Sequence, residues 1–269
     1  MELITIVAVT CLLLVALAFS PLGLGGGVLY VPILYYLLEW EMQEAVVGSL
    51  GLVFMVALGS SLAHSGSGYA DHKVANIGRI TAIPAAILGV ILSGVLLSSV
   101  GDIGIKLLAA IILAFVIERT IRNALSSQTN QEQEIDISQK TNQYRIGTAF
   151  AGTASGILGI GGGAILVTLN RSILKMDANK AAGTSYLIGA TIVPVALLSH
   201  ILINKNFSTI LESTGILPMI IIPLCALACA FFGAKYAIKY LSKSVITGVF
   251  ICAVSISLLR YIWDFISLV

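Results

Sequence analysis

Charge is scarce in this chain. Charged residues make up only 10% of its 269 residues, whereas hydrophobic residues make up 58%. Ordinary soluble domains carry about 25% charged residues. The mean hydropathy of +1.00 agrees with this composition. These values exclude a soluble globular protein and indicate an all-α integral membrane protein surrounded by lipid bilayer. The net charge of +2 gives no reason to expect nucleic acid as a partner.

Other signals are also missing. The first lysine or arginine is Lys73, so no basic region precedes the first apolar run, and a cleaved signal peptide is not expected. No further ligand accompanies Cys225 and Cys229, and packing is therefore favoured over a metal site. We expect no metal and no cofactor. An intramembrane enzyme is disfavoured because the chain has no G-x-S-x-G or H-E-x-x-H motif.

Two glycine-rich interruptions stand out within the apolar runs. Residues 20–32 read SPLGLGGGVLYVP, and residues 155–167 read SGILGIGGGAILV. Glycine costs a helix about 1 kcal/mol relative to alanine, and proline about 3 kcal/mol. A shift of 136 residues lays 20–31 over 156–167, with six identical pairs among twelve. The interruptions therefore indicate an internal repeat with a helix break in each copy.

The same shift continues beyond the glycines. It pairs Ala45 with Ala181, Ser49 with Ser185 and His64 with His200. We therefore predict a first membrane repeat over 1–118, a polar linker over 119–143 and a second membrane repeat over 144–269. Each repeat is expected to contain a broken, re-entrant pair of helices and three transmembrane helices.

The basic residues predict how the repeats are oriented. With re-entrant breaks, each half has an odd number of crossings and the repeats are inverted. One face then carries 12 of the 15 basic residues, and the other face carries Lys106, Lys205 and Arg260. Basic loops prefer the cytoplasm. This predicts a cytoplasmic linker and both termini outside. The 12 are Lys73, Arg79, Arg119, Arg122, Lys140, Arg145, Arg171, Lys175, Lys180, Lys235, Lys239 and Lys243.

The runs after the breaks are short. Residues 28–38 and 164–174 would each extend about 17 Å as helices, against the roughly 30 Å of the hydrocarbon core. Half-helices are therefore favoured over the alternative in which both arms cross fully.

A break inside the membrane exposes backbone N–H groups at the start of the following half-helix. Their summed dipole attracts anions, and glycine lets a ligand approach closely. The candidate substrate-binding residues are the glycines and nearby hydroxyls, and close helix packing is the alternative role for the glycines. They are Gly25, Gly26, Gly27, Gly161, Gly162, Gly163, Ser49, Thr184 and Ser185.

Three further side chains have competing interpretations. His64 and His200 are candidates for gating or proton coupling, since histidine titrates near neutrality. The favoured alternative is an interfacial histidine with a solvated ring. Tyr186 could contact substrate, but aromatic packing is favoured.

The motifs GLGGGVLYVPIL and GILGIGGGAILV, each followed by a short helix and an A-x-x-G-S or A-x-G-T-S stretch, resemble the TauE/SafE family of sulfite exporters and related permeases. The resemblance covers nearly the whole chain. It implies sulfite or a small organosulfur anion such as sulfoacetate as substrate. Pro32 matches the family preference after the first cluster, whereas Thr168 departs from it in the second.

We therefore expect a secondary transporter for such an anion, with export favoured and alternating access between the inverted repeats. An anion channel, or a carrier of a non-sulfur small anion, is the alternative. The expected location is the bacterial or archaeal plasma (inner) membrane. A homodimer is the assembly to test.

Overall fold

The structure is a computed structural model, and it describes residues 2–126, 134–204, 207–240 and 242–266. These residues form helices and connecting segments, with no strand among them. The first half contains α1 (Glu2–Phe19), α2 (Gly27–Pro32), the π-helix η1 (Ile33–Leu37), α3 (Met42–Gly66), α4 (His72–Val100) and α5 (Asp102–Ser126). The second half contains the 3-10 helix η2 (Ile137–Gln139), α6 (Thr141–Leu158), α7 (Gly163–Ser172), α8 (Ala178–Asn204), α9 (Phe207–Thr214), α10 (Ile216–Tyr240) and α11 (Lys243–Ile266).

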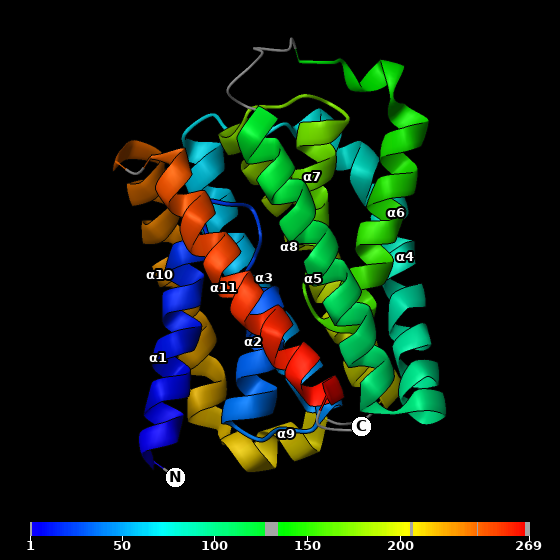
Figure 1. Cartoon of the computed structure of the whole chain (residues 1–269), viewed down its shortest axis with the longest axis vertical. Helices are drawn as coiled ribbons and strands as arrows, with labels where there is room; N and C mark the ends of the chain where they lie inside the picture. Colours follow the sequence, from blue (N-terminus) through cyan, green and yellow to red (C-terminus); the bar gives the residue numbers. More distant parts are fainter. Residues whose placement is uncertain (1, 127–133, 205–206, 241, 267–269) are drawn as a thin grey trace.

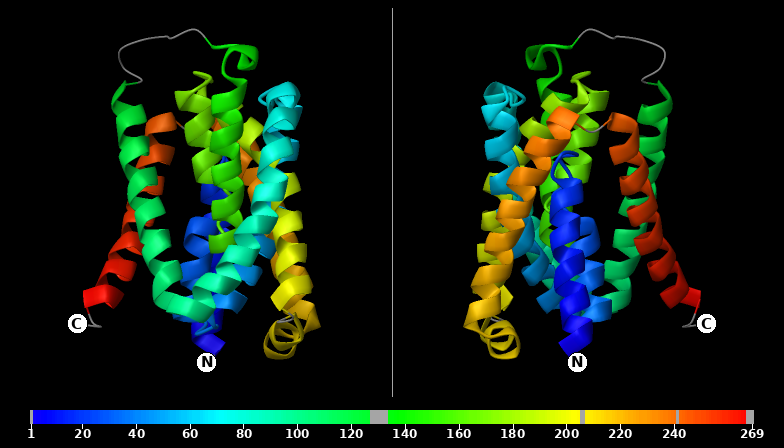
Figure 2. Two further views of the ribbon diagram at one scale, coloured as in Figure 1. Left: turned by 90° about the vertical axis from the view of Figure 1, so that its right-hand side faces the viewer. Right: turned by 90° about the vertical axis from the view of Figure 1, so that its left-hand side faces the viewer.

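The helices stand roughly side by side in one elongated bundle (Figure 1). The start of α1 and the end of α11 lie at one end, which we name the termini face (Figures 1 and 2). The end of α5 and the start of α6 lie at the opposite end, which we name the linker face. From the termini face α1 runs inward, and α2 with η1 leads back to it (Figure 1). From the linker face α6 and α7 do the same.

Four helices in the described residues are long and apolar enough to cross a membrane, namely α3, α4, α8 and α10. Large apolar side chains such as Leu88 on α4 and Leu224 and Phe232 on α10 are exposed on the outside of the bundle. Exposed apolar surface on this scale suits lipid contact rather than water. The chain is therefore built as a multi-pass membrane protein.

Equivalent helices of the two halves make equivalent contacts. Helix α1 packs against α10, and α6 packs against α4. Helix α3 packs against α8, and α5 packs against α11. Each half therefore completes the packing of the other, and the centre of the bundle lies between α3 and α8.

Local signals explain several helix ends. Asp71 caps α4, because its carboxylate accepts a hydrogen bond from the Val74 N–H at 3.0 Å. Gly101 and Gly215 follow α4 and α9 with φ of 70° and 78°, values that glycine adopts at low cost. Pro32 has no N–H to continue the helical ladder. The chain proceeds from it as η1.

One boundary differs from the sequence prediction. Helix α5 continues to Ser126, into the stretch predicted to be a linker. An ion pair between Glu118 and Arg122, one turn apart, supports this extension. In the second half, Gly215 turns the chain between α9 and α10.

Candidate functional site

The two glycine-rich stretches form breaks between helices. The first break is residues 20–26 and the second break is residues 159–162. Both depend on left-handed backbone, which glycine adopts without steric strain. The φ values lie between 67° and 82° at equivalent positions of the two breaks, namely Gly23, Gly25, Gly26, Gly159, Gly161 and Gly162.

The breaks touch each other backbone to backbone. A Cβ placed on Gly27 would lie 2.6 Å from the Cα of Ile160. A Cβ placed on Gly163 would lie 2.6 Å from the carbonyl oxygen of Gly23 and 2.9 Å from the carbonyl carbon of Leu24. Ile160 is the residue 136 positions after Leu24, so the two contacts are reciprocal. At both positions only glycine leaves room for the opposite chain.

Two buried serines brace the breaks, also reciprocally. The Ser49 hydroxyl on α3 donates a hydrogen bond to the Gly159 carbonyl at 2.8 Å. The Ser185 hydroxyl on α8 donates to the Gly23 carbonyl at 3.0 Å and lies 3.2 Å from the Gly163 carbonyl. Both serines, which are candidate site residues from the sequence, thus lie beside the breaks. In this conformation each serine hydroxyl hydrogen is given to a backbone carbonyl.

The half-helices α2 and α7 begin at the contact between the breaks. Their N-caps are Gly26 and Gly162, and neither has a side chain that caps the helix. A cavity of about 20 Å³, room for about one water molecule, adjoins the first turns of both half-helices. Its wall includes Gly27 and Val28 of α2 and Ala164 of α7. The rest of the wall is Val31, Leu158, Ile160, Tyr261 and one face of α5, namely Ile105, Ala109, Ile112, Leu113 and Val116.

The remaining candidate glycines pack tightly rather than line the cavity. Gly25 and Gly161 both face the side chain of Val53. The Thr184 hydroxyl accepts a hydrogen bond from the Asp71 N–H at 3.0 Å. Thr184 therefore faces the α3–α4 connection, although its neighbour Ser185 faces the breaks.

His64 and His200 are fully buried, with 0% and 1% of their surface exposed. The favoured expectation of solvated, interfacial rings is therefore wrong. The Nε2 of His64 lies 3.3 Å from the Ser20 carbonyl, and that of His200 lies 2.7 Å from the Gly156 carbonyl. A carbonyl only accepts, so both Nε2 atoms carry the hydrogen. Through Nε2 the rings satisfy backbone carbonyls of Ser20, just after α1, and of Gly156, near the end of α6.

Tyr186 holds the first break through its hydroxyl. That oxygen accepts from the Gly25 N–H at 3.3 Å and donates to the Phe19 carbonyl at 2.8 Å. Its ring packs 5.8 Å from the ring of His64. Packing was expected from the sequence, but the two backbone contacts were not, because the shift of 136 residues pairs Tyr186 with Leu50, which has no hydroxyl.

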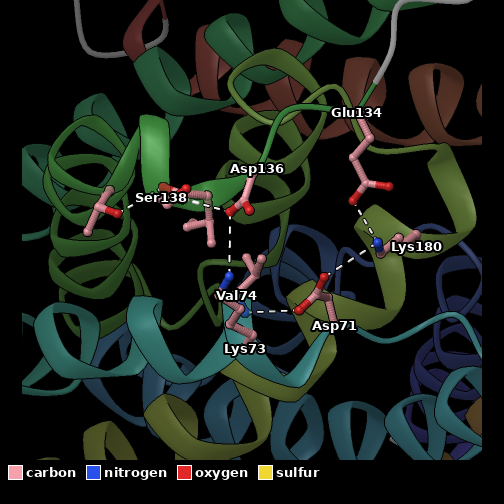
Figure 3. A network of polar contacts seen from close by, with 9 residues as sticks. Asp71, Lys73, Val74, Glu134, Asp136, Ser138 and Lys180 are labelled. Atoms are coloured by element: carbon pink, nitrogen blue, oxygen red, sulfur yellow. Dashed lines mark hydrogen bonds and ion pairs between the residues drawn. The ribbon is translucent and has the colours of Figure 1, made fainter.

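A network of polar contacts lies at the linker face (Figure 3). Lys180, at the start of α8, pairs with Glu134 at 2.6 Å and with Asp71 at 3.4 Å. Lys73 lies 3.5 Å from Asp136. Hydrogen bonding from the Ser138 N–H lowers the pKa of Asp136 below its ordinary value. The segment that precedes α6 is thereby tied to the starts of α4 and α8.

Comparison with protein families decides the membership of this chain. The model of the sulfite exporter TauE/SafE family matches residues 8–261, which include both breaks and both bracing serines. The chain belongs to the TauE/SafE family. Comparisons with curated proteins and with solved structures gave no match. The family is one of membrane transporters that are named for sulfite export.

Proposed function

We propose that this TauE/SafE protein is a secondary transporter, favouring export, for sulfite or a small organosulfur anion such as sulfoacetate. The anion binds where the two breaks meet, near the middle of the membrane. The observation that carries this proposal is the cavity against the first turns of both α2 and α7. The start of a helix carries about half a positive charge, and two such starts face one ligand.

The absence of a fixed cation suits turnover. Apolar side chains and backbone line the described cavity, with Tyr261 as its one polar side chain there. Uncharged N–H donors hold an anion more weakly than a buried lysine or arginine would. Ser49 and Ser185 already touch the breaks and would turn toward the anion when their carbonyl contacts loosen. Weak binding lets the anion leave on the other side.

The reciprocal contacts support two inverted repeats, over 1–118 and 144–269, with the linker over 119–143 between them. Gly27 with Ile160 corresponds to Gly163 with Leu24. A two-fold axis across the bundle would produce such pairs. Alternating access follows when one repeat tilts against the other around the breaks. The preference of basic residues for the cytoplasm supports an orientation with both termini outside the plasma membrane.

The cavity also indicates which helices move. A volume for about one water molecule is too small for an anion with four or more heavy atoms. Helix α5 supplies five of the lining residues and Tyr261 of α11 supplies another. Separation of α5 and α11 from the breaks would therefore admit the anion.

Counterflow in proteoliposomes tests the proposal. Vesicles that contain the purified protein are preloaded with sulfite, and uptake of labelled sulfite is measured. Sulfoacetate, sulfate and acetate are added as competitors. We expect saturable exchange that a sulfur anion blocks, and its loss in Gly163→Leu, whose side chain would collide with Leu24 and Gly23. Gly51→Leu is the matched control, because nothing lies within 4 Å of a Cβ at Gly51.

Each other outcome is informative. Large ohmic currents without counterflow would make the protein an anion channel. Exchange blocked by acetate and not by sulfur anions would make it a carrier of another small anion. Full exchange in folded Gly163→Leu would contradict the site itself.

A further inference from the structure

The termini face holds an ion cluster that lies outside the breaks. Lys106 on α5 pairs with Asp264 on α11, with Nζ 2.7 Å from Oδ2. Arg260, one turn before Asp264, places its Nη1 2.5 Å from Oδ1. Lys106 and Arg260 are two of the three basic residues that the charge pattern assigns to this face. Both converge on one carboxylate.

Tyrosines from η1 complete the cluster. The Tyr36 hydroxyl donates to Asp264 Oδ2 at 2.6 Å. The Lys106 ammonium lies 4.5 Å from the centre of the Tyr35 ring, and the Arg260 guanidinium lies 4.2 Å from that of Tyr36. The side chains of Lys106 and Asp264 are only 10% and 14% exposed. Asp264 thus sits in a cage of two cations and a phenol hydroxyl.

The cage lies between the cavity and the termini face. Val31 and Tyr261 line the cavity. Tyr35 comes four residues after Val31, and Asp264 comes three residues after Tyr261. Both η1 and α11 run toward the termini face (Figure 1). An anion that moves between the cavity and that face along α5 and α11 meets this layer.

A carboxylate and a sulfur oxyanion present the same chemistry to such a cage. Each offers at least two oxygens that share a negative charge, and each accepts short hydrogen bonds from ammonium, guanidinium and phenol groups. Asp264 is tethered, so it competes with a free anion at a high local concentration. Such competition keeps a two-cation site from trapping the substrate.

We propose that Lys106, Arg260 and Tyr36 form a second anion-binding site, occupied in this conformation by the Asp264 carboxylate, which the transported oxyanion displaces. The proposal rests on the proposed transport function. Displacement also breaks the pairs that Asp264 makes with Lys106 of α5 and Tyr36 of η1. Arrival of the anion is thereby coupled to release of α11 from α5, the movement that the cavity needs.

The test is sulfite exchange in proteoliposomes of uniform orientation, with sulfite varied on one side at a time. Lys106→Gln removes a charged hydrogen-bond donor and should raise the half-saturating sulfite concentration at the termini face about tenfold or more. The value at the linker face should stay unchanged. Arg122→Gln is the matched control, since Arg122 also pairs with one carboxylate but lies near the linker face.

Asp264→Asn removes the competitor and should lower the half-saturating concentration at the termini face while it slows maximal exchange. Lys106→Met combined with Asp264→Asn removes both buried charges, so neither is left unpaired. Weaker sulfite binding in this variant would then reflect loss of the site and not loss of folding. Half-saturation that stays at the wild-type value in all three variants would overturn the second site and leave the transport function intact.

Binding distinguishes the two proposals if the wild type exchanges no anion. Sulfite should then still raise the melting temperature of Asp264→Asn more than that of the wild type, and Lys106→Met with Asp264→Asn should lose the increase. That result would keep the site and reject the transport proposal. Equal shifts in all of these proteins would reject the site.

Discussion

The first break, residues 20–26, and the second break, residues 159–162, share a backbone path and differ in what holds it. Gly25 and Gly161 have the same φ of 73°. Helix α6 nevertheless reaches Leu158, whereas α1 ends at Phe19, before the equivalent of that residue. The first break is the longer one, and the Tyr186 hydroxyl bridges it. The shared backbone path of the two breaks is therefore stabilised by an additional side chain, Tyr186, in the break whose preceding helix ends earlier.

The half-helices that follow also differ. The first becomes a π-helix after Pro32. In the second, Thr168 stands at the equivalent position, and its hydroxyl donates to the Ala164 carbonyl at 2.9 Å within a regular α7. The π-helix carries the Tyr35 ring to Lys106 and the Tyr36 hydroxyl to Asp264. The termini face thus has a polar layer to which η1 contributes Tyr35 and Tyr36.

The largest effect should come from the shared part of the breaks. Gly27→Ala and Gly163→Ala each force a Cβ into the opposite backbone, at a cost of about 1–3 kcal/mol, and we expect both to abolish sulfite exchange. Gly51→Ala, with open space around its Cβ, should retain it. Exchange and melting temperature are measured for all three. Loss in one variant with full activity in the other would show that the breaks do not act as a pair.

A smaller effect is expected from a substitution that alters the first break and leaves the second unchanged. Tyr186→Phe leaves the Gly25 N–H and the Phe19 carbonyl without the hydroxyl, and we expect it to lower the free energy of unfolding by about 1–3 kcal/mol. Tyr236→Phe is the control, because Tyr236 is 60% exposed. Denaturant titration in detergent measures both. Equal stability of the two variants would mean that the first break does not depend on Tyr186.

The smallest structural effect concerns the paired histidines. His64→Gln and His200→Gln keep a side-chain N–H for the Ser20 and Gly156 carbonyls but cannot titrate near neutrality. We expect exchange to continue and its pH dependence near neutrality to flatten in both. The exposed His72 provides the control, as His72→Gln. An unchanged pH profile in both buried variants would leave these histidines a purely structural role.

The sequence predicted the breaks well because glycine and proline act locally. The short helices expected from residues 28 and 164 begin one residue earlier, at Gly27 and Gly163. The left-handed glycines are local features too. The serines were identified by aligning the chain with itself, because the shift that pairs the glycines also pairs Ser49 with Ser185.

Contacts between distant residues were not predictable in this way. The burial of His64 depends on the Ser20 carbonyl, and the hydroxyl of Tyr186 acts on Gly25, 161 positions away. Lys106 and Asp264 are 158 positions apart. In the sequence each looks like a charged surface residue near a helix end. Only the packing of α5 against α11 brings the two side chains together.

The crossed serines have a consequence for how the protein is made. Ser49 secures a carbonyl of the second half, and Ser185 secures a carbonyl of the first. When the first half leaves the ribosome, its break has polar backbone groups whose partners have not yet been synthesised. Unpaired backbone groups are costly in lipid. The first half must therefore be sheltered by the insertion machinery, or wait partly inserted, until α8 arrives.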